Sequence, residues 1–348
     1  MDISFSFARH KDRGESRINS KPLTILDANG WLKTMTYDAA RRQTGIKYGD
    51  GTAVTYGYDA VSNRTTMVDS TGTTSYAYSP RHELIGKTDP GGLVQSYNFD
   101  SASNRTKLVD PDGGIFTYTY DAVNRQVTQQ VPSGEKFTMG YDADGRNSTI
   151  IQALGGYEIQ TSDALNRSAT EISYNVASSP ITTVVDTYDP AGRKTKQVRD
   201  SLITTYSYDN GDRLTAQAGN TPPSGTSESL TMDELGNVTY KTNQTGVGVT
   251  STSFVYDAAS RLESTSTSGV LTAYTYDNNG NMTAEGSSIN NTYDRENRLS
   301  VIMNGIDPTT LTYDGTGLRR SKQWVQSGAT KTTTYVWDGT DYLSEYTY

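Results

Sequence analysis

The 348-residue sequence contains no cysteine and only two histidines, His10 and His82. Without cysteine the chain can form neither a disulfide nor a thiolate metal site. A Ser-His-Asp triad would need one of the two histidines, and neither stands beside a nucleophile-elbow motif. We therefore expect no catalytic residues and no zinc site, and we interpret both histidines as exposed loop residues.

Hydrophobic residues are scarce. They make up 33% of the chain and the mean hydropathy is −0.65, which is low for a protein of this size with a large dry core. No apolar run approaches the ~20 residues of a membrane span, and residues 1–22 lack the apolar segment of a signal peptide. We interpret residues 1–22 as an irregular N-terminal leader, we expect no membrane span, and the localisation remains unknown.

An excess of positive charge is also absent. The chain has 39 acidic and 31 basic residues, giving a formal net charge of −8. Its lysines and arginines form no basic stripe, which is the electrostatic footprint of nucleic-acid binding. We expect no nucleic-acid partner.

Tyrosine is abundant, with 25 copies, and it follows a pattern. In the segment YTYDAVNR, Tyr118 and Tyr120 are two residues apart, so on a strand they share a face. Asp121 favours a turn because its carboxylate hydrogen-bonds nearby backbone. Asn124 tolerates the left-handed conformation of a tight turn, and Arg125 opens a second strand. The segment predicts a β-hairpin.

The same unit recurs about fifteen times along the chain, and such a period is typical of repeat architectures. The tyrosine before the aspartate, or its substitute, recurs at steps of 20 or 21 residues from Tyr58 to Ser162 and of 17 to 26 residues later. No helical period is sustained. The structural repeat residues are Tyr58, Asp59, Arg64, Tyr118, Tyr120, Asp121, Arg125, Tyr141, Asp142, Arg146, Tyr188, Asp189, Arg193, Tyr208, Asp209, Arg213, Tyr256, Asp257, Arg261, Tyr293, Asp294 and Arg298.

These units predict an all-β fold of tandem antiparallel hairpins over residues 23–348, wet on both faces, with tyrosine as the packing group. A tyrosine ring buries area while its hydroxyl stays hydrogen-bonded. The segment Gly219–Gly225 contains Pro222-Pro223 and cannot be a central strand. We interpret it as a long rim loop and not as a domain boundary, because the repeat resumes on both sides.

The repeat aspartates are equivalent by position, whereas acid–base catalysis needs two carboxylates in different environments. We interpret them as turn-capping groups that pair with the repeat arginines, each exposed pair contributing about 0–1 kcal/mol. We also expect Arg125 to stack on the strand of Tyr118 and Tyr120. Stacking between successive hairpins is the structural interpretation, and a carbohydrate- or peptide-binding Arg–Tyr ladder is the alternative.

Two oxygen-rich turns, Asp110–Gly114 and Asp277–Asn281, raise calcium as a ligand. Neither has the spacing of an EF-hand, because Gly280 comes too early and no glutamate stands at the last position of the loop. We interpret both as ordinary turns and expect no metal and no other cofactor.

Units such as Tyr206–Arg213 (YSYDNGDR) and Tyr188–Arg193 (YDPAGR) resemble the YD repeats of the RHS family. These repeats also occur in the B and C components of Tc toxins, in wall-associated proteins and in teneurins. The resemblance covers residues 23–348 and implies one long curved sheet that spirals into a hollow shell. In the family this shell encloses a C-terminal toxin or serves cell-surface contact, and its members are secreted or cell-surface proteins.

The segment Tyr335–Tyr346 resembles the part that precedes the family's C-terminal core, which in toxin-bearing members holds an aspartate-dependent self-cleavage site in an Asp-Pro motif. We expect that core and the toxin region to be absent here. The four Asp-Pro pairs of this chain, which we interpret as repeat turns, are Asp89-Pro90, Asp110-Pro111, Asp189-Pro190 and Asp307-Pro308.

Three functions remain open. The first is a non-enzymatic shell or scaffold segment, whose partner would be its own missing C-terminal effector or a toxin cargo. The second is a cell-surface module that binds glycans, and the third is a hydrolase. The residues Tyr346–Tyr348 read as mid-strand, and unpaired strand edges template association. We therefore expect the isolated chain to self-associate, which light scattering would detect.

Overall fold

The computed structural model describes residues 23–348 except 153–154 and 220–224. In this part of the chain there are 31 β-strands and no helix, and hence no helix that could cross a membrane. The predicted all-β fold is confirmed. The leader expected at residues 1–22, and most of the rim loop expected at Gly219–Gly225, lie outside the described residues.

Consecutive strands pair antiparallel, so the sheet is a continuous meander from the first strand to the last. The strands are β1 (Leu23–Leu26), β2 (Leu32–Tyr37), β3 (Gln43–Tyr48), β4 (Ala53–Tyr58), β5 (Arg64–Asp69), β6 (Gly72–Tyr78), β7 (Leu84–Asp89), β8 (Leu93–Phe99), β9 (Arg105–Val109), β10 (Ile115–Tyr120), β11 (Gln126–Gln130), β12 (Lys136–Tyr141), β13 (Asn147–Ile151), β14 (Tyr157–Ser162), β15 (Ser168–Tyr174), β16 (Pro180–Tyr188), β17 (Lys194–Arg199), β18 (Leu202–Tyr208), β19 (Leu214–Gly219), β20 (Thr226–Met232), β21 (Val238–Thr245), β22 (Gly248–Tyr256), β23 (Leu262–Thr267), β24 (Val270–Tyr276), β25 (Met282–Glu285), β26 (Ile289–Tyr293), β27 (Leu299–Asn304), β28 (Pro308–Tyr313), β29 (Arg319–Gln326), β30 (Ala329–Asp338) and β31 (Asp341–Thr347).

Two kinds of turn alternate along the chain and lie at opposite rims of the ribbon. The turns that begin with the repeat aspartate form the YD rim. In one of them Asn124 has φ +64° and its N–H donates to the carbonyl of Asp121. The register shifts by one residue just before this turn, between Thr119 and Tyr120. Such bulges bend and twist a strand pair, and because they recur from repeat to repeat they curve the whole ribbon. The other turns form the distal rim.

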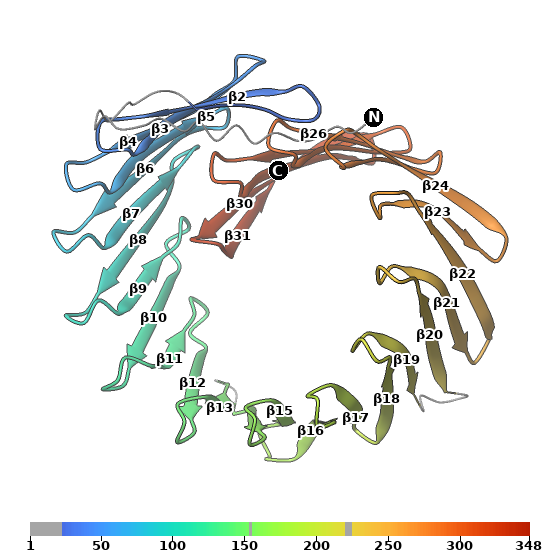
Figure 1. Ribbon diagram of the computed structural model, residues 1–348. Helices are drawn as coiled ribbons and strands as arrows, with labels where there is room; N and C mark the ends of the chain where they lie inside the picture. Colours follow the sequence, from blue (N-terminus) through green and yellow to red (C-terminus); the bar gives the residue numbers. More distant parts are fainter. Residues whose placement is uncertain (1–22, 153–154, 220–224) are drawn as a thin grey trace, which may run out of the picture.

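The ribbon curves through one full circuit and then overlaps itself, so it is a spiral and not a closed ring (Figure 1). We call β1–β23 the first circuit and β24–β31 the start of the second. The strands β30 and β31 lie on the inner side of β7–β9 (Figure 1), and Lys87 Nζ on β7 donates to the Trp337 carbonyl on β30 at 3.0 Å. The predicted curved, spiralling antiparallel sheet is confirmed.

The face of β7 that carries Lys87 points towards β30 and is therefore the concave face. Directly paired residues on neighbouring strands share a face, so the register follows this face around the spiral. Tyr118 and Tyr120 pack against one cluster and share the face, as predicted. The aromatic residues that precede the YD turns on this face are Tyr56, Tyr76, Tyr97, Tyr118, Tyr206, Phe254, Tyr274 and Tyr335.

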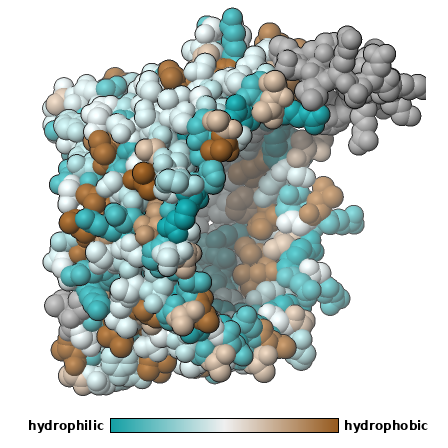
Figure 2. All heavy atoms as spheres, turned by 90° about the vertical axis from the view of Figure 1, so that its left-hand side faces the viewer, coloured by the Kyte–Doolittle hydropathy of each residue, from teal (hydrophilic) through white to brown (hydrophobic). Residues whose placement is uncertain are grey.

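Burial is concentrated where the two circuits overlap. The buried hydrophobic side chains are Tyr48, Val54, Met67, Tyr97, Leu108, Tyr118, Val184, Leu311 and Val336. Of these only Val184 lies away from the overlap, since Tyr118 on β10 belongs to the cluster against which Leu343 of β31 packs. The sheet is therefore wet on both faces along its middle strands, as the low hydropathy predicts, but dry at the overlap, which the repeat pattern did not indicate. On the face shown in Figure 2, hydrophobic residues are scattered among polar ones, and the surface is hollowed on one side.

The first and last strands that the structure describes are β1 and β31. In the described part of the chain each of them pairs with one strand only, and all four residues of β1 are exposed. The predicted self-association through strand edges remains a prediction.

Candidate functional site: the seam of the spiral

The YD turn is held by its aspartate. Asp121 Oδ1 accepts hydrogen bonds from the N–H groups of Val123 and Arg125, and its Oδ2 contacts Arg125 Nε at 2.7 Å. One carboxylate thus satisfies the backbone of the turn and fixes the arginine. The same Asp–Arg pair, four residues apart, occurs at Asp38, Asp142, Asp163, Asp189, Asp209, Asp257 and Asp294.

The prediction that every repeat aspartate pairs with an arginine is wrong in several repeats, where an asparagine takes that place. Asp59 Oδ2 accepts from Asn63 Nδ2 at 2.8 Å and not from Arg64. The residue four positions on is the one that reaches the carboxylate, and here it is asparagine. Arg64 comes one position later, on the strand, and its guanidinium lies over the rings of Tyr56 and Tyr76. An asparagine four positions on also donates to the carboxylate at Asp100, Asp233 and Asp277.

The repeat tyrosine links each repeat to the one before it. Tyr141 donates its hydroxyl to the Gln126 carbonyl at 2.6 Å, and the Arg125 guanidinium lies 4.4 Å from the Tyr141 ring centre. The predicted stacking between successive hairpins is therefore confirmed, but the partner of Arg125 is Tyr141 and not Tyr118 or Tyr120, because the YD turns stand side by side on one rim and the arginine reaches the next repeat. The same hydroxyl bond is made by Tyr58, Tyr78, Tyr120, Tyr188, Tyr208, Tyr256, Tyr276, Tyr293 and Tyr313.

Removing one of these hydroxyls gives a first test. Tyr141→Phe leaves the half-buried Gln126 carbonyl without its partner and is expected to cost about 1 kcal/mol. Tyr240→Phe is the matched control, since that ring is 44% exposed. Hydrogen exchange should accelerate in β11 and β12 of Tyr141→Phe, and exchange in β21, the strand of Tyr240, should be unchanged in Tyr240→Phe. Unchanged exchange in both variants would mean that the hydroxyl bond has no net effect.

Acid should weaken the YD rim. The Arg125 N–H holds the pKa of the Asp121 carboxyl below its ordinary value of 3.8, with burial acting the other way and the guanidinium adding to the lowering. The same direction holds for the pKa values of Asp142, Asp209 and Asp257. A lowered folded-state pKa gives stability that is complete above the unfolded value and is lost as pH falls through the folded value. We expect thermal stability to be flat above about pH 5 and to fall steeply below about pH 4; a stability that rises on acidification would contradict this role.

The two circuits meet along a seam in which the distal rim of the first lies on the YD rim of the second. Side chains about 250 residues apart contact one another, which no hairpin interaction could achieve. The pairs that join the distal rim of the first circuit to the YD rim of the second include Asn29 with Asp277, Lys33 with Glu296, Asp50 with Arg295, and Asp69 with the Gly315 N–H. At β9 and β30 the two YD rims meet, because Arg105 follows one YD turn and contacts Asp338 of another.

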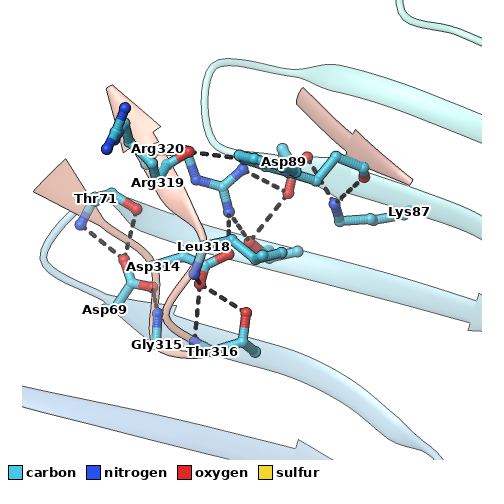
Figure 3. A network of polar contacts seen from close by, with 12 residues as sticks. Asp69, Thr71, Lys87, Asp89, Asp314, Gly315, Thr316, Leu318, Arg319 and Arg320 are labelled. Atoms are coloured by element: carbon cyan, nitrogen blue, oxygen red, sulfur yellow. Dashed lines mark hydrogen bonds and ion pairs between the residues drawn. The ribbon is translucent and has the colours of Figure 1, made fainter. Parts of the chain in front are cut away.

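A buried charge network lies at the centre of the seam (Figure 3). Arg320 Nη1 is 2.9 Å from Asp89 Oδ1, and Arg320 Nη2 is 3.3 Å from Asp314 Oδ2. Lys87 Nζ is 3.0 Å from Asp89 Oδ2. All four residues are at most 9% exposed. Two cations balance two carboxylates here, which is the condition under which charges are tolerated in a protein interior.

The repeat bulge explains how the network forms. Thr312 pairs with Ser321 and Tyr313 pairs with Arg319, so Arg320 is the extra residue of the bulge. Bulges re-aim a side chain, and this one directs Arg320 into the first circuit. Leu343 is the extra residue of the bulge in β31 and packs against the cluster of Tyr97, Leu108 and Tyr118.

Close approach of the backbone explains a glycine at the seam. A Cβ on Gly315 would lie 2.5 Å from Val54 Cγ1 and 3.0 Å from Met67 Sδ. The Gly315 N–H instead donates to Asp69 Oδ2 at 2.7 Å, and the Tyr56 hydroxyl donates to the Gly315 carbonyl. The sequence Asp314-Gly315 therefore lets one YD turn rest directly on the core of the first circuit.

A hollow of about 720 Å³ opens between the two circuits beside this network. The Tyr48 hydroxyl donates to Glu296 Oε1 at 2.5 Å, and the Arg295 guanidinium lies 4.4 Å from the Trp31 ring centre. Burial, followed by the Glu296 carboxylate, raises the pKa of Tyr48. The ionisable groups named here are thus paired across the seam, and among the described residues no three His, Asp or Glu side chains gather as a metal site.

Sequence reasoning did not identify the seam, although two signals were present. The distal turns of the early repeats each carry an aspartate, whereas many later ones are made of glycine, serine and threonine; the early ones are Asp27, Asp50, Asp69, Asp89 and Asp110. In addition, Arg320 stands at the bulge position that threonine, serine or an apolar residue occupies in nearly all other repeats. Both departures from the repeat mark contacts that lie outside the repeat.

Comparison with known proteins agrees with this architecture. Residues 27–160 match the family model described as teneurin YD-shell, and residues 256–288 match that of the RHS repeat. No curated protein sequence matches the chain.

Solved structures of Tc toxin components share the fold. The chain is similar to the crystal structure of TcdB2-TccC3-TEV (TM-score 0.77, 14% identity, 92% of this chain and 20% of that one). It is also similar to the Photorhabdus luminescens Tc holotoxin pore with a mutation in TccC3 (TM-score 0.78, 14% identity, 94% and 20%) and to TcdB2-TccC3 (TM-score 0.77, 13% identity, 94% and 21%). The chain spans about a fifth of the length of these chains.

Proposed function

As the chain belongs to the RHS/YD-repeat family, we propose that residues 23–348 form a wall segment of a hollow shell that encloses an effector polypeptide. The observation that carries the proposal is the seam. Two successive circuits of one ribbon are joined there by buried side chains, so the wall continues past a single ring without a second sheet. The role is structural, and the repeat carboxylates, arginines and tyrosines support the wall instead of performing chemistry.

The composition of the concave face supports enclosure of a polypeptide. Following the register through the middle strands, its residues include Gln129, Glu158, Glu171, Asp186, Gln217 and Glu228. Apolar residues of the same face, such as Met139, Ile150 and Tyr206, lie among these polar and acidic groups, so the lining is mixed and is not one continuous apolar surface to which an unfolded chain would adhere. Such a lining can surround a cargo without binding it permanently.

Enclosure can be tested with single cysteines, because the chain has none of its own. Thr204 and Thr205 are neighbours on β18; Thr204 pairs with Gln197 on the concave face, and Thr205 is exposed on the convex face. We expect a small maleimide to label both Thr204→Cys and Thr205→Cys. A maleimide coupled to a large polymer should label Thr205→Cys at the small reagent's rate and Thr204→Cys much more slowly. Equal labelling of both by the large reagent would contradict enclosure.

The contents of the shell need a separate experiment. A long unfolded reporter fused after Tyr348 should slow the small reagent at Thr204→Cys if the reporter occupies the concave side, and should leave Thr205→Cys unchanged. A reporter that affects neither position, or both equally, would contradict a polypeptide cargo. The two experiments can fail independently, because the first tests whether the wall excludes a large reagent and the second tests whether a polypeptide occupies the concave side.

A second candidate function is glycan binding at an aromatic hollow in β28–β31. The ring centres of Trp337 and Tyr342 are 5.9 Å apart, those of Tyr335 and Tyr342 are 6.3 Å apart, and the hollow of about 410 Å³ also contains Arg319. Tyr342 is 53% exposed, so a ring face is open to stacking. A glycan array supports this function if a hit is lost in Tyr342→Ala and retained in Tyr240→Ala, and an array without hits removes it.

A further inference from the structure

Two Asn-Gly dipeptides meet across the seam. Asn29-Gly30 lies in the first distal turn and Asn279-Gly280 in the YD turn after β24. They are about 250 residues apart in sequence, yet both asparagine side chains are half-buried against one another while both glycines remain exposed. The chain has two further Asn-Gly pairs, at Asn210 and Asn304, in exposed positions on turns that do not take part in the seam contacts described above.

The contacts between the two turns are reciprocal. Asn29 Nδ2 donates to Asp277 Oδ2 at 3.0 Å, and Asn279 Nδ2 donates to Asp27 Oδ2 at 2.8 Å. In return, Asn279 Oδ1 accepts from the Asn29 N–H at 3.2 Å and Asn29 Oδ1 accepts from the Asn278 N–H at 3.0 Å. Each side-chain amide therefore serves as donor and as acceptor to the opposite turn.

These contacts depend on the asparagines being neutral amides. An aspartate at position 29 would lose the Nδ2 donor and place a second carboxylate about 3 Å from that of Asp277, where two like charges cannot both remain ionised without cost. Burial raises the pKa of Asp277, but hydrogen bonds from Asn281 and then Asn29 outweigh it and keep that pKa below 3.8. The site is therefore arranged for an ionised Asp277 facing an amide.

Asn-Gly is also the dipeptide most prone to lose its amide. The glycine backbone nitrogen attacks Cγ of the asparagine, the Cγ–Nδ2 bond breaks and ammonia leaves, and the resulting succinimide takes up one water to give aspartate or isoaspartate. No oxidant or reductant takes part. The missing glycine side chain leaves the attacking nitrogen unhindered.

Contacts within each turn and contacts across the closed seam both oppose this reaction. The Gly30 N–H donates to the Asp27 carbonyl and the Gly280 N–H donates to the Asp277 carbonyl, each at 3.0 Å. Both reacting nitrogens are thus engaged within their own turns, whereas both side-chain amides are held from the opposite circuit. Reaction needs the turn to open locally, and opening of the seam removes the second restraint, which is the hold on the side-chain amide.

We propose that Asn29 and Asn279 form a deamidation-sensitive latch, a modification site whose conversion to aspartate releases the start of the second circuit from the first. While the seam is closed the latch is protected. If the seam stays open long enough for an asparagine to convert, the change is irreversible. The fraction of converted asparagine therefore reports how long the seam has been open. The reactant is water alone, and the site requires no enzyme.

The first test measures the rate of conversion in the full chain. After incubation at mildly alkaline pH, peptide mapping by mass spectrometry should find Asn29 and Asn279 converted roughly tenfold more slowly than Asn304, since each is held by at least two hydrogen bonds. Glu296→Gln, which weakens the neighbouring Lys33 contact, should raise the rates at Asn29 and Asn279 and leave that at Asn304 unchanged. Equal rates at all three sites in the native chain would overturn the proposal.

The second test measures the consequence. Asn29→Asp and Asn279→Asp should increase hydrogen exchange in β2 and β25 together, while the matched variants Asn304→Asp and Asn210→Asp should not. The increase should diminish at a pH low enough to protonate one of the facing carboxylates. Native exchange in both strands of Asn29→Asp would show that the amide does not hold the seam, and the latch would be excluded.

Discussion

Replacing Arg320 by alanine is expected to open the seam, at a cost of about 3–5 kcal/mol. In this variant the buried Asp314 loses its cationic partner, and Asp89 keeps Lys87 as its one remaining ion-pair partner in the network. A buried charge without a partner is among the most destabilising single changes. Because the network joins strands β7 and β29 from the two circuits, the effect should extend to both.

Hydrogen exchange is the suitable measurement, because long repeat arrays do not unfold in one cooperative step. Exchange in β5–β9 and β27–β31 should accelerate by two to four orders of magnitude, which is what about 3–5 kcal/mol corresponds to. The strands β14–β18 should be unchanged, since they contact only their neighbours. Arg319→Ala is the control, because that side chain is exposed on the same strand. If Arg319→Ala and Arg320→Ala behave alike, the network is not what holds the circuits together.

Met67→Ala should have the next largest effect, about 2–5 kcal/mol. Met67 is 1% exposed and belongs to the cluster of Tyr48 and Val54, on which Gly315 of the second circuit rests. Truncation leaves a cavity between two rigid backbones that cannot easily collapse, and cavity terms are largest at such sites.

Val68→Ala is the matched control for this prediction, because Val68 is the next residue on β5, faces the other side and is 42% exposed. Its change should stay within about 0.5 kcal/mol. Thermal unfolding followed by circular dichroism should show an early loss of signal for Met67→Ala only. A Met67→Ala variant that melts like the wild type would mean that the overlap is not packed as described.

The local structure of a repeat was predictable because it depends on residues that are adjacent in the sequence. The alternation of Tyr118 and Tyr120, the turn at Asp121 and the left-handed Asn124 each follow from rules about neighbours along the chain. Stacking between successive hairpins was predicted, but Tyr141 was not named as the partner of Arg125, for a related reason. Sequence proximity favoured Tyr118, whereas the hairpins place the same rim of successive repeats side by side.

The seam was not predictable in the same way, because its contacts depend on the curvature of the whole ribbon. A small change in the bend of each bulge would bring Asp89 opposite a different YD turn. Only the departures from the repeat, such as Arg320 and the glycine of Asp314-Gly315, carry local information about the overlap. Recognising them requires knowing first which residues the repeat would otherwise have placed there.

The winding of the ribbon onto itself is tested most directly by a zero-length cross-linker that joins an amine to a carboxylate in contact. Lys33 Nζ lies 2.7 Å from Glu296 Oε2 across the seam. Lys194 with Asp186, on adjacent strands, provides an internal control at 2.5 Å. We predict that carbodiimide treatment of the dilute chain yields both cross-links within single molecules. Formation of the Lys194–Asp186 link without any Lys33–Glu296 link would contradict the spiral.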